Sequence, residues 1–126
     1  MSVTLVLDTS AILAYAKGSI AVGELISIIA DDGDTALVPA TCLAEAYRVL
    51  PGSESQLLGV LASVPSVGLA PLGGDQAVDV GTSAHDIGID LAHAAAEAIA
   101  HDAQLATQHR VVLDRLLPPD WPILDV

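Results

Sequence analysis

The sequence contains no phenylalanine, one tryptophan, two tyrosines and a single cysteine, Cys42. Because one cysteine cannot form an internal disulfide, the composition favours a protein of a reducing compartment that is stabilised by apolar burial. Hydrophobic residues make up 52% of the 126 positions, and they are mostly Ala, Leu, Val and Ile. We therefore predict a single domain over residues 1–126 with an aliphatic core.

Basic residues are also scarce. Four fixed cations, Lys17, Arg48, Arg110 and Arg115, stand against 16 acidic residues, and the formal net charge is −12. A protein that grips nucleic acid with a broad basic surface is therefore excluded. A polyanionic substrate would have to be attracted by a bound metal ion, by a partner, or by these few cations. Alternatively, the acidity only keeps the domain in solution.

Long hydrophobic runs and common nucleotide motifs are missing too. No window approaches the roughly 20 apolar residues that span a bilayer, and residues 1–5 lack the basic start of a signal peptide. We expect a cytoplasmic protein without a membrane partner. The chain has no Gly-x-x-x-x-Gly-Lys, Gly-x-Gly-x-x-Gly or Gly-x-Ser-x-Gly motif.

Short apolar runs alternate with longer segments of helical periodicity. Strands are predicted at residues 3–7, 35–38, 67–70, 104–106 and, as an edge strand, 123–126. Helices are predicted at residues 10–16 (capped by Thr9 or Ser10), 20–30, 41–50, 53–62, 75–83 (capped by Asp75), 90–101 and 111–116. This alternation predicts an α/β fold, in which helices cover a central parallel sheet of four to five strands.

Asp8 is the first candidate for chemistry, because it directly follows the apolar run Leu5 to Leu7. A carboxylate there is costly to bury unless something pairs with it. A hard divalent cation would do so, and so would a role as a helix N-cap. Ligands of open parallel sheets bind beyond the carboxyl ends of the strands, which is where Asp8 is expected.

Two further carboxylates lie on predicted helices. Asp90 begins one helix and shares a helical face with His93, Glu97 and His101. Such a polar stripe usually faces solvent, although its first residue, Asp90, could instead line a cleft. His93 with Glu97 could ligate a transition metal, but surface positions are favoured. Glu45 faces away from the apolar stripe of its own helix, and taken alone this favours solvent.

Four segments together resemble the PIN-domain family, especially the VapC-type toxins. They are Val6-Leu7-Asp8-Thr9-Ser10-Ala11-Ile12-Leu13-Ala14, Thr41-Cys42-Leu43-Ala44-Glu45, Ile89-Asp90-Leu91-Ala92-His93-Ala94-Ala95-Ala96 and Leu105-Ala106-Thr107. Their order and spacing and the chain length all fit, so the resemblance covers nearly the whole chain. It implies a three-layer α/β/α sandwich.

The resemblance also implies a function. It suggests a metal-dependent endoribonuclease, the toxin of a type II toxin–antitoxin system, that forms a homodimer and is blocked by a cognate VapB-type antitoxin. On this interpretation Asp8, Glu45 and Asp90 hold Mg²⁺ or Mn²⁺, and Thr107 supports them in catalysis. Oxygen-only ligation suits these hard ions.

One position departs from the family pattern. The family often has a further aspartate two residues after the threonine, whereas this chain has His109. Asp86, Asp102 or Asp114 could compensate; the alternative is a weakened or inactive PIN-like binding domain. Two other enzyme classes fit poorly: a haloacid-dehalogenase-like enzyme would need an aspartate at Ser10, and a receiver domain would need a late lysine, but Lys17 is the only lysine.

Overall fold

The computed structural model describes residues 2–126 and contains one five-stranded sheet. Its strands are β1 (Val3–Leu7), β2 (Thr35–Pro39), β3 (Val67–Ala70), β4 (Gln104–Thr107) and β5 (Ile123–Asp125). They lie in the order β3-β2-β1-β4-β5, and every neighbouring pair is parallel. The predicted parallel sheet is confirmed, including the edge strand near the C-terminus.

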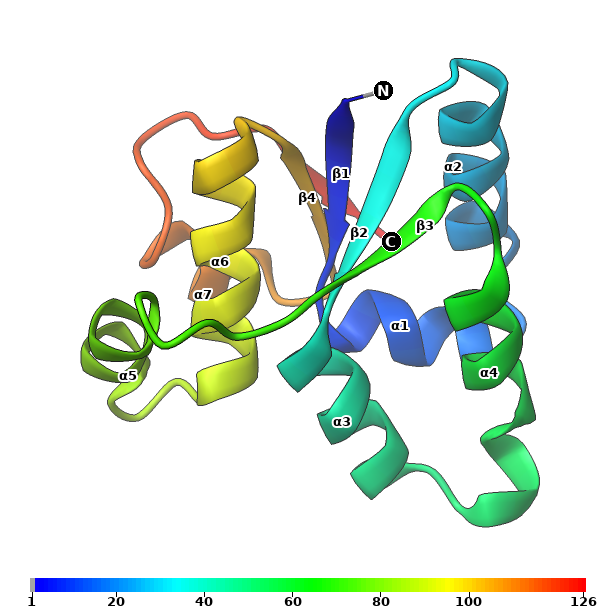
Figure 1. Cartoon of the computed structure of the whole chain (residues 1–126), viewed down its shortest axis with the longest axis horizontal. Helices are drawn as coiled ribbons and strands as arrows, with labels where there is room; N and C mark the ends of the chain where they lie inside the picture. The colour runs from blue at the N-terminus through cyan, green and yellow to red at the C-terminus, as the bar shows by residue number, and fades with distance from the viewer. Residues whose placement is uncertain (1) are drawn as a thin grey trace.

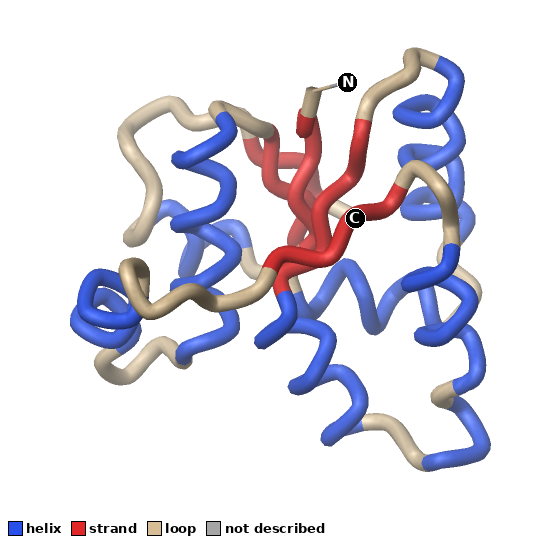
Figure 2. Tube along the Cα trace, in the orientation of Figure 1, coloured by secondary structure: helices blue, strands red, loops and turns tan. Residues whose placement is uncertain are grey.

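Helices connect the strands and cover both faces of the sheet. They are α1 (Thr9–Ala16), α2 (Ile20–Asp31), α3 (Ala40–Val49), α4 (Gln56–Ser63), α5 (Ala77–Ala84), α6 (Ile89–His101) and α7 (Arg110–Asp114), with a 3-10 turn at Gly52–Glu54. In Figure 1, α6 and α7 lie on one side of the strands, and α2 and α4 lie on the other. Figure 2 shows the strands as a central layer between helices. The fold is therefore a three-layer α/β/α sandwich.

The middle of the sheet forms the core. Leu5, Val6 and Leu7 in β1 are all buried, as expected for a central parallel strand that has helices on both faces. Alanines such as Ala94 and Ala98 of α6 are also buried in this core. Small side chains let a helix lie close to its neighbours, so aromatic residues are not needed to fill the interior.

Several predicted helix starts were wrong by one or two residues, and one of these differences concerns the site. Helix α1 begins at Thr9, so the predicted cap at Thr9 or Ser10 is wrong, and the N-cap is Asp8, which confirms the alternative role given for Asp8 above. Helix α5 begins at Ala77, and its N-cap residue Gln76 makes no side-chain capping bond, so the predicted cap at Asp75 is also wrong. Asp8 has an extended backbone and accepts from the N–H of Ala11, and the helix dipole favours a negative charge there, whereas Thr9 and Ser10 already lie within the helix.

The helices are short for a bilayer. Within residues 2–126, no single helix is long and apolar enough to cross a membrane. Only α1 and α2 taken together have the necessary length and composition, and these two helices are bent by 105° relative to each other.

Candidate functional site

Asp8 lies just past the end of β1 and is fully buried. Three groups donate hydrogen bonds to its carboxylate. Ser10 Oγ and the backbone N–H of Ala11 donate to Oδ1 over 2.6 Å and 2.9 Å. Thr107 Oγ1, at the end of the neighbouring strand β4, donates to Oδ2 over 2.5 Å. Two adjacent strand ends therefore meet at one buried carboxylate.

The directions of these hydrogen bonds are fixed by the segment that follows β4. The backbone N–H of Gln108 donates to Ser10 Oγ, and that of His109 donates to Thr107 Oγ1, each over 2.8 Å. A hydroxyl has a single proton, and each of these hydroxyls directs its proton to Asp8. Asp8 is therefore surrounded by donors, an arrangement that suits an ionised carboxylate.

Two effects on the acidity of Asp8 oppose each other. Burial raises the pKa of Asp8 above its ordinary value, because a charged carboxylate is deprived of water. The hydrogen bonds from Ser10, Thr107 and Ala11, and the nearby His109, lower the pKa in part. No cationic side chain among residues 2–126 forms an ion pair with Asp8. The site holds a buried acid whose charge is hydrogen-bonded but not neutralised.

Asp90 is connected to the same place through the residue next to Asp8. Thr9 Oγ1 donates to Asp90 Oδ2 over 2.5 Å. The Cys42 thiol donates to the backbone carbonyl of Asp90 over 3.1 Å. Burial raises the pKa of Cys42, which keeps the thiol protonated as this donor and makes it unsuitable as a nucleophile.

A cavity of about 420 Å³ opens beside these residues, and we call it the edge pocket. It is lined by Thr9, Ser10, Leu13, Ala14, Lys17, Glu45, Val49, Ile87, Asp90, Leu91, Gln108 and His109. The structure thus brings Asp90 and Glu45 to one cavity. Asp8 and Thr107 are buried behind it and are connected to it through Ser10. Of the four residues expected from the sequence, Asp90 and Glu45 line the edge pocket, whereas Asp8 and Thr107 lie behind its wall at the carboxyl ends of β1 and β4.

Glu45 is the member of this group with a competing partner. Arg48, one helical turn later on α3, donates to both of its carboxylate oxygens over 2.5 to 3.0 Å. The Arg48 guanidinium lowers the pKa of Glu45 below its ordinary value. Glu45 therefore does not simply face solvent, as its helical position alone suggested. It lines the edge pocket and is engaged by a surface arginine.

The donor chemistry of the pocket fits a hard divalent cation, because it offers carboxylate and hydroxyl oxygens around an acid that lacks a counter-ion. The carboxylates are not close enough together to coordinate one ion as they stand. Within residues 2–126, no group of three or more His, Cys, Asp or Glu side chains is placed to hold a metal ion. Asp8, Asp90 and Glu45 thus offer the type of oxygen ligand that a hard divalent cation prefers. The carboxylate of Glu45, however, is paired with Arg48.

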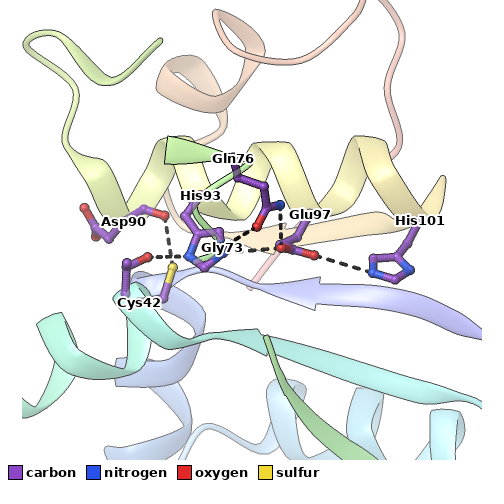
Figure 3. A network of polar contacts seen from close by, with 8 residues as sticks. Cys42, Gly73, Gln76, Asp90, His93, Glu97 and His101 are labelled. Atoms are coloured by element: carbon purple, nitrogen blue, oxygen red, sulfur yellow. Dashed lines mark hydrogen bonds and ion pairs between the residues drawn. The ribbon is translucent and has the colours of Figure 1, made fainter. Parts of the chain in front are cut away.

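A second polar cluster lies along α6, and Figure 3 shows it. His93 and Glu97 are buried, so the expectation that this polar stripe faces solvent is wrong. Thr41 Oγ1 lies 2.7 Å from His93 Nδ1, and His93 Nε2 lies 3.3 Å from Glu97 Oε1. Gln76 donates to Glu97 Oε1 over 3.0 Å, and His101 Nε2 lies 3.4 Å from Glu97 Oε2. Side chains of α3 and of the segment before α5 thus cover the stripe.

Contacts of this cluster hold together the two helices, α3 and α6, that contribute Glu45 and Asp90 to the edge pocket. Thr41 and Cys42, neighbours at the start of α3, contact His93 and the backbone of Asp90 on α6. These two contacts hold the first turns of α3 and α6 together. Glu45, one turn further along α3, and Asp90 on α6 therefore both lie in the pocket wall.

Sequence reasoning missed the residues that connect the site. Thr9 and Ser10 were considered only as helix caps, whereas they bond to Asp90 and Asp8. Two hydroxyl residues directly after a strand-ending aspartate were the available signal. A comparison of the chain with protein-family models and with curated proteins found no match in either set.

Proposed function

We propose that this protein is a metal-dependent endoribonuclease of the PIN-domain type and acts as the toxin of a type II toxin–antitoxin pair. One observation carries the proposal. Asp90 and Glu45 line one pocket, and the adjacent residues Thr9 and Asp8 connect Asp90 to the buried Asp8–Thr107 pair at the carboxyl ends of β1 and β4. This edge is where sheets of this kind bind their ligands.

Asp8, Asp90 and Glu45 would hold Mg²⁺ or Mn²⁺. When bound, such an ion lowers the pKa of water and neutralises charge on a phosphodiester. Ser10 and Thr107 hold Asp8 in one orientation through opposite oxygens. Hydrogen bonds of this kind around a carboxylate fix its orientation, and a cation that binds Asp8 would have to displace Ser10 or Thr107 from one of its oxygens.

Asp90 is the best-placed group to accept a proton. Thr9 occupies its Oδ2 atom, which leaves Oδ1 for a water molecule or the cation. In the proposed hydrolysis, the water oxygen bonds to phosphorus and the bond from phosphorus to the 3′ oxygen breaks. A proton from the water reaches the 3′ oxygen by way of Asp90 or solvent. The products are a 5′-phosphate and a 3′-hydroxyl.

The proposal includes partners. An antitoxin of the VapB type would cover the edge pocket, and the toxin would act in the cytoplasm as a homodimer. The single buried thiol suits a reducing compartment.

A non-catalytic relative is the second candidate function. His109, where the family often has an acid, and the open spacing of the carboxylates favour it. Incubation of the purified protein with RNA and Mg²⁺ or Mn²⁺, with an EDTA control and analysis of the product ends, separates the two. The nuclease gives metal-dependent fragments with 5′-phosphates. The binding domain gives no fragments from folded, partner-free protein.

A further inference from the structure

The four fixed cations of this acidic chain are unevenly distributed. Arg110 pairs with Asp125, and Arg115 lies 4.0 Å from Asp86. The other two lie at the edge pocket. Lys17 lines it directly, and Arg48 is bound to Glu45, which lines it.

Lys17 and Arg48 differ in the ion pairs that their side chains form. Lys17 forms no ion pair within residues 2–126, although the chain carries 16 acidic residues. Arg48 uses Nε and Nη2 to hold Glu45, and its Nη1 donates to no acceptor in that part of the chain. A guanidinium has five N–H donors in a fixed plane, so Arg48 has donors left for a second anion. Lys17 therefore keeps binding capacity in the pocket wall, and Arg48 keeps it beside Glu45.

Helix position is a simpler reason for a cation to lie here. Lys17 is the C-cap of α1, and Arg48 is in the last turn of α3, where the helix dipole favours positive charge. Arg115 occupies the matching place as the C-cap of α7, away from the edge pocket. The chain thus contains its own control for the effect of helix position.

We propose that Lys17 and Arg48 bind two backbone phosphates of an RNA strand, one from α1 and one from α3. This inference rests on the proposed function and extends it to the substrate contacts. On a chain of net charge −12, a phosphate strand is repelled from most of the surface. Lys17 in the wall of the edge pocket and Arg48 on its lining residue Glu45 are available for phosphates there, and a divalent cation held by the carboxylates of the same pocket would offset their negative charge.

The proposal sets the salt dependence of binding. Two phosphate contacts to a single strand give a slope of about −1.4 in a plot of log affinity against log salt. Loss of one cation reduces that slope by about 0.7. A protein that tracks a strand with a broad basic surface would give a much steeper slope.

The test uses full-length protein in which Asp8→Asn prevents cleavage, and a fluorescently labelled, short single-stranded oligoribonucleotide with Mg²⁺ present. Binding anisotropy is measured over a range of KCl concentrations. We expect Lys17→Gln and Arg48→Gln each to weaken binding about three- to tenfold and to flatten the salt slope. Arg115→Gln, which removes the same charge from the C-terminal end of another helix, leaves both quantities unchanged. Equal effects of all three substitutions would overturn the proposal, because net charge alone would explain them.

Two further measurements, a competition with phosphate and a kinetic comparison, distinguish the phosphate contacts from binding of free phosphate and from the nuclease activity itself. Millimolar inorganic phosphate is added as a competitor; full displacement of the RNA that depends on Lys17 and Arg48 would assign the site to free phosphate and overturn the strand assignment. In the otherwise unchanged chain, Lys17→Gln and Arg48→Gln should each raise KM for RNA cleavage. For Lys17→Gln, which breaks no ion pair with a proposed metal ligand, kcat should stay within about twofold. Cleavage with an unchanged KM would reject the two contacts and keep the nuclease. Cation-dependent binding without any cleavage would reject the nuclease and keep the contacts.

Discussion

Thr107 Oγ1 donates a hydrogen bond of 2.5 Å to Asp8 Oδ2, although 99 positions separate the two residues in the sequence. The contact exists because β4 is the direct neighbour of β1 and both strands end at the same edge. The backbone N–H of His109 donates to the same hydroxyl. This one side chain therefore joins the buried acid to the wall of the edge pocket.

Replacement of Thr107 by valine tests this junction. Thr107→Val leaves Asp8 without one donor and His109 N–H without its acceptor, so we expect the unfolding free energy to fall by about 1–3 kcal/mol. The control is Thr4→Val on β1, because Thr4 Oγ1 is buried without a hydrogen-bond partner. Urea denaturation should show no loss for the control. Equal losses in both variants would mean that the Thr107 bond contributes nothing specific.

The buried charge of Asp8 predicts a pH dependence in metal-free buffer. Burial raises the pKa of Asp8 above its ordinary value of 3.8, so the folded state favours the protonated acid. Its stabilising contribution is present below that ordinary value and is lost as pH rises through the folded pKa. The wild type should therefore lose stability relative to Asp8→Asn as pH rises above the ordinary pKa of 3.8.

Urea unfolding of both proteins in EDTA across this pH range measures the difference. The asparagine side chain of Asp8→Asn does not titrate, so its own effect on the unfolding free energy is the same at every pH. The change with pH of the difference between the two proteins therefore reports the titration of Asp8 alone. Addition of Mn²⁺ should stabilise the wild type and leave Asp8→Asn unchanged. A difference that does not vary with pH would show that Asp8 titrates normally.

His93 and His101 form a matched pair, since both contact Glu97 but only His93 is fully buried. His93→Ala leaves a cavity and removes the partner of Thr41, so we expect a loss of about 2–4 kcal/mol. His101→Ala, at an exposed position, should cost less than about 0.5 kcal/mol. Should His93→Ala fail to fold, His93→Gln supplies the comparison. Similar costs at both positions would contradict the described burial.

Gly88 allows α6 to start with Asp90 in its first turn. It has a φ of 117°, and a Cβ placed there would lie 3.0 Å from Asp90 Oδ1. Gly88→Ala should lower the unfolding free energy by about 1–3 kcal/mol through backbone strain. It should also reduce RNA cleavage by displacing the Asp90 carboxylate.

Gly23 provides the comparison for that substitution, because it lies inside α2 and a Cβ at this position would meet nothing within 4 Å. Gly23→Ala should stabilise the protein by up to about 1 kcal/mol and leave cleavage unchanged. If Gly88→Ala matched Gly23→Ala in both measurements, the backbone at Gly88 would not be under the constraint described here.

The fold was predictable because local signals and topology agree. Short apolar runs such as residues 3–7 alternate with helical segments, and this pattern has one common solution, a covered parallel sheet. Asp8 stood out for the same reason, as an acid that ends a buried strand. The burial of His93 and Glu97 was not predictable, because a helical wheel gives the direction of a side chain but not what covers it. Thr41 and Gln76, distant in sequence, provide that cover.

The most direct test of the proposed function is the cleavage of RNA by three purified proteins, the wild type, Asp8→Asn and Asp31→Asn, with Mn²⁺ and with EDTA. Asp31, an exposed acid at the end of α2, controls for the loss of one negative charge. We expect fragments from the wild type and from Asp31→Asn with Mn²⁺ only, and none from a folded Asp8→Asn. Metal-dependent cleavage by Asp8→Asn at the wild-type rate would contradict a catalytic centre built on Asp8.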